Sequence, residues 1–166
     1  MALFHVSCKL YSIGECLIRT SETQYFKKKK EKNQEWVDLM LNQHKPNNAP
    51  LRQYTYYAFD SISNCGAFFS NHTCATEGPF YYSVEMKDPV KVPMCLIDLI
   101  LHEGQNSNNL TKIISEYWNP TLHWNVFEYL SNEMKIISLV DKPSAIITAK
   151  GKIDYGEDVK IRRQLK

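Results

Sequence analysis

The sequence predicts a single α+β domain built on a largely antiparallel or mixed sheet, and three observations favour this fold class. A chain of 166 residues has room for one compact domain but not for two independent catalytic domains. Its composition, 43% hydrophobic and 23% charged, is typical of a globular protein and not of a disordered or coiled-coil chain. Helical patterns come early and strand patterns late, without the regular alternation that a parallel sheet requires.

The first half of the chain predicts short strands followed by two helices. Residues 2–7 and 16–18 have strand composition and are separated by a turn at Gly14. Residues 31–44 carry apolar side chains at helical spacing, and the proline-containing loop 46–50 ends that helix. The aromatic segment 53–59 is typical of a strand.

A helix follows this aromatic strand, and Asp60 or Ser61 is suited to cap it. One face of this helix carries apolar residues or glycine, namely Ile62, Cys65, Gly66 and Phe69. Phe68 lies about 110° from the centre of that stripe at 100° per residue, and is therefore expected to face something other than the core.

The second half predicts mainly strands. Residues 80–86 alternate between apolar and polar side chains, and residues 110–117 form an apolar helical stripe. Further strands are expected at 126–130, 134–140 and 145–149, and the middle one of these three is expected to be buried on both faces.

The cysteines and the apolar runs predict a cytoplasmic protein without a membrane segment. The five cysteines are odd in number and contain no Cys-x-x-Cys pair, which suits neither a disulfide framework nor a zinc knuckle. The longest apolar run, 94–101, is interrupted by Asp98 and is far shorter than the ~20 residues that span a bilayer. The first residues lack the pattern of a secretory signal.

Charge divides the chain into a near-neutral domain, residues 1–149, and a basic tail, residues 150–166. The tail carries six basic and three acidic groups, which leaves 14 basic against 15 acidic groups in the domain. Lys27 to Lys30 form a second basic cluster. Contact with nucleic acid and plain solvated loop charge are both open for this cluster, and the second reading is the more common for such runs.

Several kinds of active site are excluded by their missing motifs. The chain has neither of the glycine-rich phosphate-binding motifs of Rossmann and P-loop proteins, and no Gly-x-Ser-x-Gly elbow. The histidines show no paired metal-ligand spacing, so no metal cofactor is expected.

The residues that remain form an ordered set along the chain. Phe4-His5-Val6-Ser7 opens the first strand, Tyr57 and Phe68 stand eleven residues apart on a strand and the next helix, and Glu128-Tyr129-Leu130 precedes a strong strand. This set resembles the ADP-ribosyltransferase superfamily, in the His-Tyr-Glu branch typified by diphtheria toxin. The branch commonly has Tyr where this chain has Phe68.

A closer resemblance is to small, uncharacterised bacterial domains that are grouped with these transferases. The motifs that carry it are Arg52 to Tyr57, Tyr82-Ser83, Tyr117-Trp118-Asn119, Glu128-Tyr-Leu130 and Lys135-Ile-Ile. They run in order from His5 to Val140, whereas residues 19–50 and 150–166 are not covered. The resemblance implies the split, mainly antiparallel sheet of that family with flanking helices.

The resemblance also implies a role for each site residue, with NAD+ as the substrate. Glu128 is the catalytic carboxylate that stabilises an oxocarbenium-like transition state. Tyr57 and Phe68 sandwich the nicotinamide ring, and His5 hydrogen-bonds a ribose hydroxyl without acting as a base. Arg52 is further expected to meet the pyrophosphate, and Ser83 to support Glu128.

Each of these residues also has an ordinary structural interpretation. His5 alone suits a half-buried histidine whose hydrogen bonds are satisfied, and Tyr57 and Phe68 suit core aromatics. Glu128 and Ser83 suit outward positions of strands, and Arg52 suits a surface salt bridge.

The leading hypothesis is an NAD+-dependent mono-ADP-ribosyltransferase with a macromolecular acceptor, either protein or nucleic acid. By resemblance to bacterial toxins and phage-defence effectors, an antitoxin or inhibitor protein is a possible further partner. Two alternatives stay open: an NAD+ glycohydrolase, and a catalytically inactive domain that binds a nucleotide or a protein.

Overall fold

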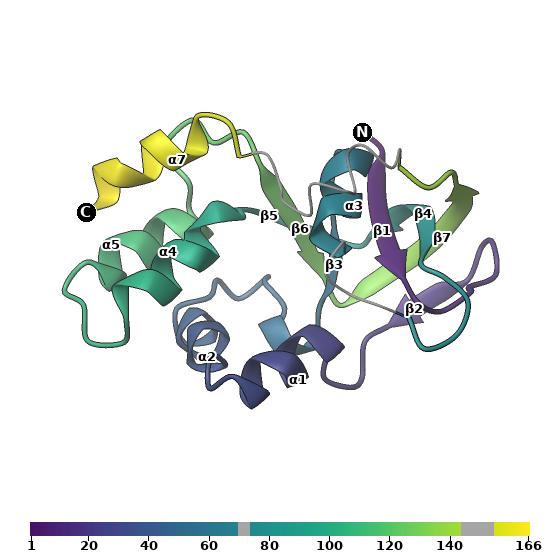
Figure 1. The fold of residues 1–166 in the computed structure, drawn as a ribbon, viewed down its shortest axis with the longest axis horizontal. Coiled ribbons are helices and arrows are strands. Elements are labelled where there is room, and N and C mark those ends of the chain that lie inside the picture. The colour runs from purple at the N-terminus through teal and green to yellow at the C-terminus, as the bar shows by residue number, and fades with distance from the viewer. Residues whose placement is uncertain (70–73, 144–154) are drawn as a thin grey trace.

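Two antiparallel sheets form the centre of the fold (Figure 1), in a computed structural model that describes residues 1–69, 74–143 and 155–166. The first sheet has the order β1-β4-β7-β2, with strands Leu3–Ser7, Phe80–Met86, Glu133–Val140 and Cys16–Ile18. The second has the order β3-β6-β5, with strands Tyr56–Ala58, Phe127–Ser131 and Val90–Pro93. The predicted α+β class with antiparallel strands is confirmed.

The two sheets meet where β1 passes β3. Phe4 and Phe59 form an isolated bridge, in which the Phe4 N–H donates to the Phe59 carbonyl at 2.7 Å and the Phe59 N–H donates to the Phe4 carbonyl at 2.9 Å. This bridge brings His5 of the first sheet beside Tyr57 of the second. Residues that are far apart in the chain therefore meet at the seam between the sheets.

The helices divide between the two sheets (Figure 1). Helix α3 (Ile62–Phe69) packs on β1. The other helices are α1, which meets α3 through Tyr25 and Phe68, and α2, α4, α5 and α7, which lie on the side of the second sheet. Their bounds are Gln24–Glu31, Trp36–Gln43, Cys95–Glu103, Leu110–Trp118 and Asp158–Ile161. Short 3-10 turns cover Arg52–Tyr54 and Arg162–Leu165.

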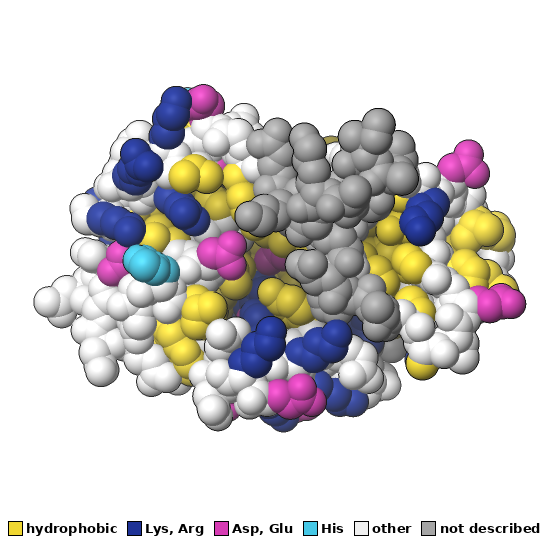
Figure 2. Space-filling model, viewed as in Figure 1, with side chains coloured by type: hydrophobic (Ala, Val, Ile, Leu, Met, Phe, Trp, Pro, Cys, Tyr) yellow, Lys and Arg dark blue, Asp and Glu magenta, His cyan; other side chains and the backbone are white. Residues whose placement is uncertain are grey.

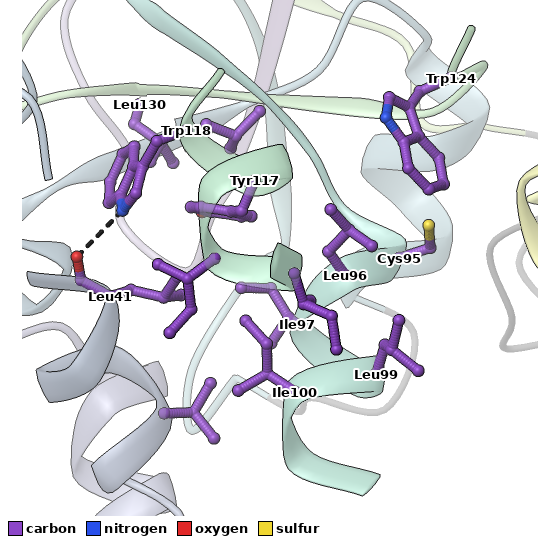
Figure 3. Packing of buried hydrophobic residues seen from close by; sticks show 14 of the residues in the cluster. Leu41, Cys95, Leu96, Ile97, Leu99, Ile100, Tyr117, Trp118, Trp124 and Leu130 are labelled. Atoms are coloured by element: carbon purple, nitrogen blue, oxygen red, sulfur yellow. Dashed lines mark hydrogen bonds between the residues drawn. The ribbon is translucent and has the colours of Figure 1, made fainter. Parts of the chain in front are cut away.

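The largest apolar cluster joins helices α2, α4 and α5 to the second sheet (Figure 3). Leu41, Ile100, Ile113 and Leu130 are fully enclosed within it. The ring nitrogen of Trp118 donates to the Leu41 carbonyl at 3.0 Å, so this large side chain is buried without leaving its polar atom unpaired.

Strand β7 corrects one expectation of the sequence. It was expected to be buried on both faces, but its exposure alternates, and Ile137 and Leu139 are 38% and 54% exposed. An antiparallel sheet can leave one face open to solvent, and here this strand has apolar residues on both of its faces.

Helix α1 corrects a second expectation, because the segment that contains Lys27 to Lys30 was interpreted as loop. The Oγ1 of Thr23 accepts a hydrogen bond from the Phe26 N–H at 3.0 Å, which caps the helix at its N-terminus. Phe26 and Lys29 are buried, so the lysine run is a helix with one buried position and not only solvated charge.

The C-terminal residues pack on the domain from Tyr155 onward. Asp158 is fully buried and accepts hydrogen bonds from the Asn125 and Val126 N–H groups at 2.7 and 2.9 Å. Leu165 belongs to the largest apolar cluster. The expected boundary at 149/150 and the strand expected at 145–149 fall outside the described residues.

A disulfide bond between Cys8 and Cys74 corrects the interpretation of the cysteines. It joins the end of β1 to the segment after α3 across 66 residues, a proximity that spacing alone did not show. Because disulfides persist mainly in oxidising compartments, the cysteine count no longer supports a cytoplasmic location. None of the helices in the described part of the chain is long and apolar enough to cross a membrane.

Candidate functional site

A pocket of about 580 Å³ opens at the seam between the two sheets. Its wall includes His5, Tyr57 and Phe68, which were singled out from the sequence as ligand-binding residues. They come from β1, β3 and α3, and the bridge between Phe4 and Phe59 sets their mutual position. Ligand sites commonly occupy concave places of this size with a few polar groups among aromatic ones.

His5 presents a neutral ring to this pocket. Its Nδ1 lies 2.7 Å from the Tyr57 carbonyl, which can only accept, so Nδ1 carries the proton and donates. Burial lowers the pKa of His5 to about 4, despite the opposing effect of that hydrogen bond. The neutral ring keeps Nε2 as an acceptor for a ligand hydroxyl.

Three aromatic rings form one wall of the pocket. Tyr57 and Phe68 have centroids 6.1 Å apart and planes inclined by 34°, and Tyr25 lies 6.1 Å from Tyr57 and 5.7 Å from Phe68. To hold a flat ring between them, two aromatic rings must lie about 7–8 Å apart, which is twice the van der Waals stacking distance. Tyr57 and Phe68 must therefore separate by about 1–2 Å to hold a ring between them.

The expectation that Phe68 faces something other than the core is confirmed in part. Its side chain is half-buried and packs against Phe59 as well as Tyr57, so it joins a smaller apolar cluster and also borders the pocket. Tyr25 was missed in the sequence analysis. Its signal was present in the aromatic pair Tyr25-Phe26 after the capping residue Thr23, but the four lysines that follow concealed the helix.

Glu128 lies behind this wall in a buried ionic network. It is 2% exposed and accepts hydrogen bonds from Arg52 Nη1 and from the Tyr117 hydroxyl, both at 3.1 Å. Arg52 also donates through Nε to Asp38 at 2.5 Å and contacts the Tyr117 hydroxyl. Lys29 Nζ closes the network at 3.0 Å from Asp38.

Two cations and two anions balance the charge of this network. Burial acts to raise the pKa of Asp38, but Arg52 and Lys29 outweigh it and hold that pKa below its ordinary value. Burial lowers the pKa of Lys29 and raises that of Tyr57. Breaking such a network at one member leaves an uncompensated buried charge, so its members depend on one another.

The network touches the pocket through Tyr57 and Tyr25. The Tyr57 hydroxyl donates to the Arg52 carbonyl at 3.0 Å while its ring borders the pocket. Lys29 Nζ lies 4.4 Å from the centroid of the Tyr25 ring, and burial, with the nearby Glu128 as a smaller cause, raises the pKa of Tyr25. The acid is thus enclosed next to the aromatic wall and does not project into solvent.

The structure places Arg52 and Ser83 differently from what was expected. Arg52 was expected to meet a pyrophosphate, but its Nε and Nη1 face Asp38 and Glu128 because burial demands counter-charges for the guanidinium. Ser83 was expected to support Glu128, but it lies half-buried on β4, opposite Phe4 and Ser138. Arg52 and Tyr117 hold the carboxylate instead.

Basic side chains line the open side of the pocket. Lys9, Arg19, Lys27 and Lys28 belong to its wall, together with one acidic residue, Glu22. Figure 2 shows Lys and Arg side chains over α1, and more of them over the C-terminal helix. Such a wall favours an anionic ligand.

A metal centre has no candidate in the residues that the structure describes, since no three His, Cys, Asp or Glu side chains there are grouped to hold an ion.

No protein-family model and no curated protein matches this chain.

Proposed function

We propose that this protein binds NAD+ and transfers its ADP-ribose to a macromolecular acceptor. The observation that carries the proposal is the meeting of His5, Tyr57 and Phe68 in one pocket from three separate elements. These are the side chains that the resemblance to the His-Tyr-Glu transferases assigns to the dinucleotide. The proposal also accounts for the basic wall, because NAD+ carries a diphosphate.

The aromatic wall suits the nicotinamide ring. Offset stacking on aromatic side chains contributes about 0.5–1.5 kcal/mol for each pair beyond the burial of area. Opening the contact between Tyr57 and Phe68 by about 1–2 Å admits the ring, and the half-buried position of Phe68 on α3 makes it the side that moves.

His5 suits a ribose hydroxyl. With Nδ1 donating to the Tyr57 carbonyl, Nε2 accepts from a hydroxyl group in the pocket. Because the pKa of His5 is lowered to about 4, the ring stays neutral near pH 7 and orients the ligand without acting as a base.

In the transfer step the bond between the nicotinamide nitrogen and ribose C1′ breaks, and its electron pair leaves with neutral nicotinamide. The ribose carbon becomes oxocarbenium-like, an acceptor oxygen or nitrogen attacks it, and the acceptor's proton passes to solvent. A carboxylate near the ribose stabilises the cation as it develops. We assign this charge to Glu128, which lies behind the aromatic wall, on Arg52 and Tyr117, and does not itself line the pocket.

The decisive experiment incubates the protein with NAD+ labelled in the adenylate phosphate and a cell lysate, and measures free nicotinamide and transferred label. Label that protease removes indicates a protein acceptor, and label that nuclease removes indicates a nucleic acid. His5→Ala is expected to abolish both signals, and Arg163→Gln, an exposed substitution on the C-terminal turn, is the matched control.

The other outcomes separate the alternatives. Free ADP-ribose without labelled macromolecule indicates a glycohydrolase. NAD+ binding without nicotinamide release indicates an inactive binding domain. Absence of both binding and release, beside an active control transferase, refutes the proposal.

A further inference from the structure

Arg19 is a half-buried cation of the pocket wall and has no ion pair among the described residues. Its Nε is enclosed without a hydrogen-bond partner in the part of the chain that the structure describes. Enclosed polar atoms nearly always have a partner, and leaving a guanidinium donor unpaired is costly. The atom is therefore placed for a partner that the described residues do not provide.

The position of Arg19 is held by its neighbours. Its guanidinium carbon lies 4.2 Å from the centroid of the Tyr56 ring, and its backbone N–H donates to the Asn132 carbonyl at 2.8 Å. Tyr56 in turn meets the His5 ring edge-on at 5.8 Å between centroids. Arg19 thus stands beside His5, within range to lower the pKa of that ring.

The acidic residue of the same wall does not neutralise Arg19. Glu22 pairs with Lys30, whose Nζ lies 2.8 Å from its carboxylate. Lys9, Lys27 and Lys28 add three exposed cations to the wall. Their summed field draws anions toward the pocket, and Arg19 is the donor within it whose geometry is already set.

We propose that Arg19 binds the diphosphate of the dinucleotide, the role that the sequence analysis gave to Arg52. This inference rests on the proposed function. A guanidinium presents two parallel N–H groups that match two phosphate oxygens, and the Arg19 guanidinium is held over the Tyr56 ring at 4.2 Å. Arg52 points its own donors at Asp38 and Glu128, so the two arginines have different tasks.

The test measures the binding of ADP-ribose, adenosine and inorganic pyrophosphate by calorimetry. Arg19→Gln is expected to weaken ADP-ribose and pyrophosphate binding by about ten- to hundred-fold, the range for a hydrogen bond to a charged group, and to leave adenosine unchanged. Arg19→Lys keeps the positive charge but lacks the two parallel N–H groups, so its affinity for ADP-ribose and pyrophosphate is expected to lie between those of the parent and Arg19→Gln. Arg163→Gln, an exposed arginine outside this pocket wall, is the matched control.

The outcomes distinguish this inference from the proposed function. Parental affinity of Arg19→Gln for ADP-ribose overturns the inference alone. Arg19-dependent pyrophosphate binding without any binding or cleavage of NAD+ overturns the proposed function and keeps the anion site. Failure of the parent to bind ADP-ribose, pyrophosphate and NAD+ alike overturns both. Thermal unfolding of each variant is measured in parallel, and Arg19→Lys decides the outcome if Arg19→Gln does not fold.

Discussion

Substitution of Glu128 tests both the buried network and the proposed chemistry. In Glu128→Ala the carboxylate is lost, and Arg52, which is 1% exposed, keeps only Asp38 as a counter-charge. Removing one partner of a buried ion pair costs about 3–5 kcal/mol. Because the bond from Arg52 Nε to Asp38 remains at 2.5 Å, we expect the lower end, about 3 kcal/mol.

Glu128→Gln removes the negative charge of this side chain but keeps its size and shape, unlike Glu128→Ala. The amide oxygen still accepts from Arg52 and Tyr117, but the counter-charge is lost as in Glu128→Ala, so the cost lies between about 1 kcal/mol, for a weakened hydrogen bond, and about 3 kcal/mol. For a chain of this length a loss of about 3 kcal/mol lowers the melting temperature by roughly 6–12 °C, and about 1 kcal/mol by roughly 2–4 °C.

The assay is urea unfolding followed by circular dichroism, with nicotinamide release measured on the same preparations. Glu133→Gln is the matched control, because its ion pair with Lys87 is exposed and contributes at most about 1 kcal/mol. Under the proposed function, Glu128→Gln reduces nicotinamide release by about a hundred-fold or more and keeps ADP-ribose binding.

Two results would refute this reasoning at different points. An unfolding free energy of Glu128→Ala equal to that of the parent would show that the network does not depend on this carboxylate. Parental nicotinamide release by folded Glu128→Gln would remove Glu128 from the proposed chemistry while leaving the network intact.

Three further predictions follow from the same geometry. Because the pKa of His5 falls from 6.5 to about 4 on folding, the unfolded chain binds more protons than the folded chain between these pH values. The free energy of unfolding therefore decreases as the pH falls from about 6.5 toward 4, by roughly 3 kcal/mol in all. His5→Gln is expected to lack this pH-dependent contribution when urea unfolding is measured across that range. Joint replacement of Cys8 and Cys74 by Ser, which opens a 66-residue loop, is expected to cost about 4 kcal/mol; equal unfolding midpoints with and without reductant in the parent would contradict this. Tyr25→Ala removes one stacking ring and is expected to weaken nicotinamide binding by about three- to tenfold in a fluorescence titration, whereas an unchanged affinity would exclude Tyr25 from the ring site.

Local patterns predicted most elements of this fold. The alternation in 80–86 and the helical stripe in 110–117 correspond to β4 and α5 at nearly the same bounds, because each buries one face of a regular element. Helix α1 was missed, since its apolar anchor Phe26 precedes a run of lysines, and its stability comes from a cap and from packing. Strand β5 was also missed; its short Val-Lys-Val pattern ends at a proline, which is unfavourable within a strand.

The sequence predicted three side chains of the pocket wall, but not Tyr25 or Arg19 and not the arrangement of the site. His5, Tyr57 and Phe68 carry recognisable motifs and do share a pocket. Glu128 and Arg52 were predicted as separate ligand contacts, but burial couples them into one network with Asp38. No sequence pattern marked Asp38, since its partners Lys29 and Arg52 come from other elements.

The sequence by itself determined the α+β class, the approximate bounds of its most regular elements and the types of side chain available for a ligand, because these follow from short-range periodicity and composition. Tertiary structure alone decided which charges face each other, which arginine keeps a free donor and which cysteines are joined. The reason is that a buried charge needs a counter-charge to offset its loss of hydration. These counter-charges come from segments that are distant in the chain, so local sequence does not specify them.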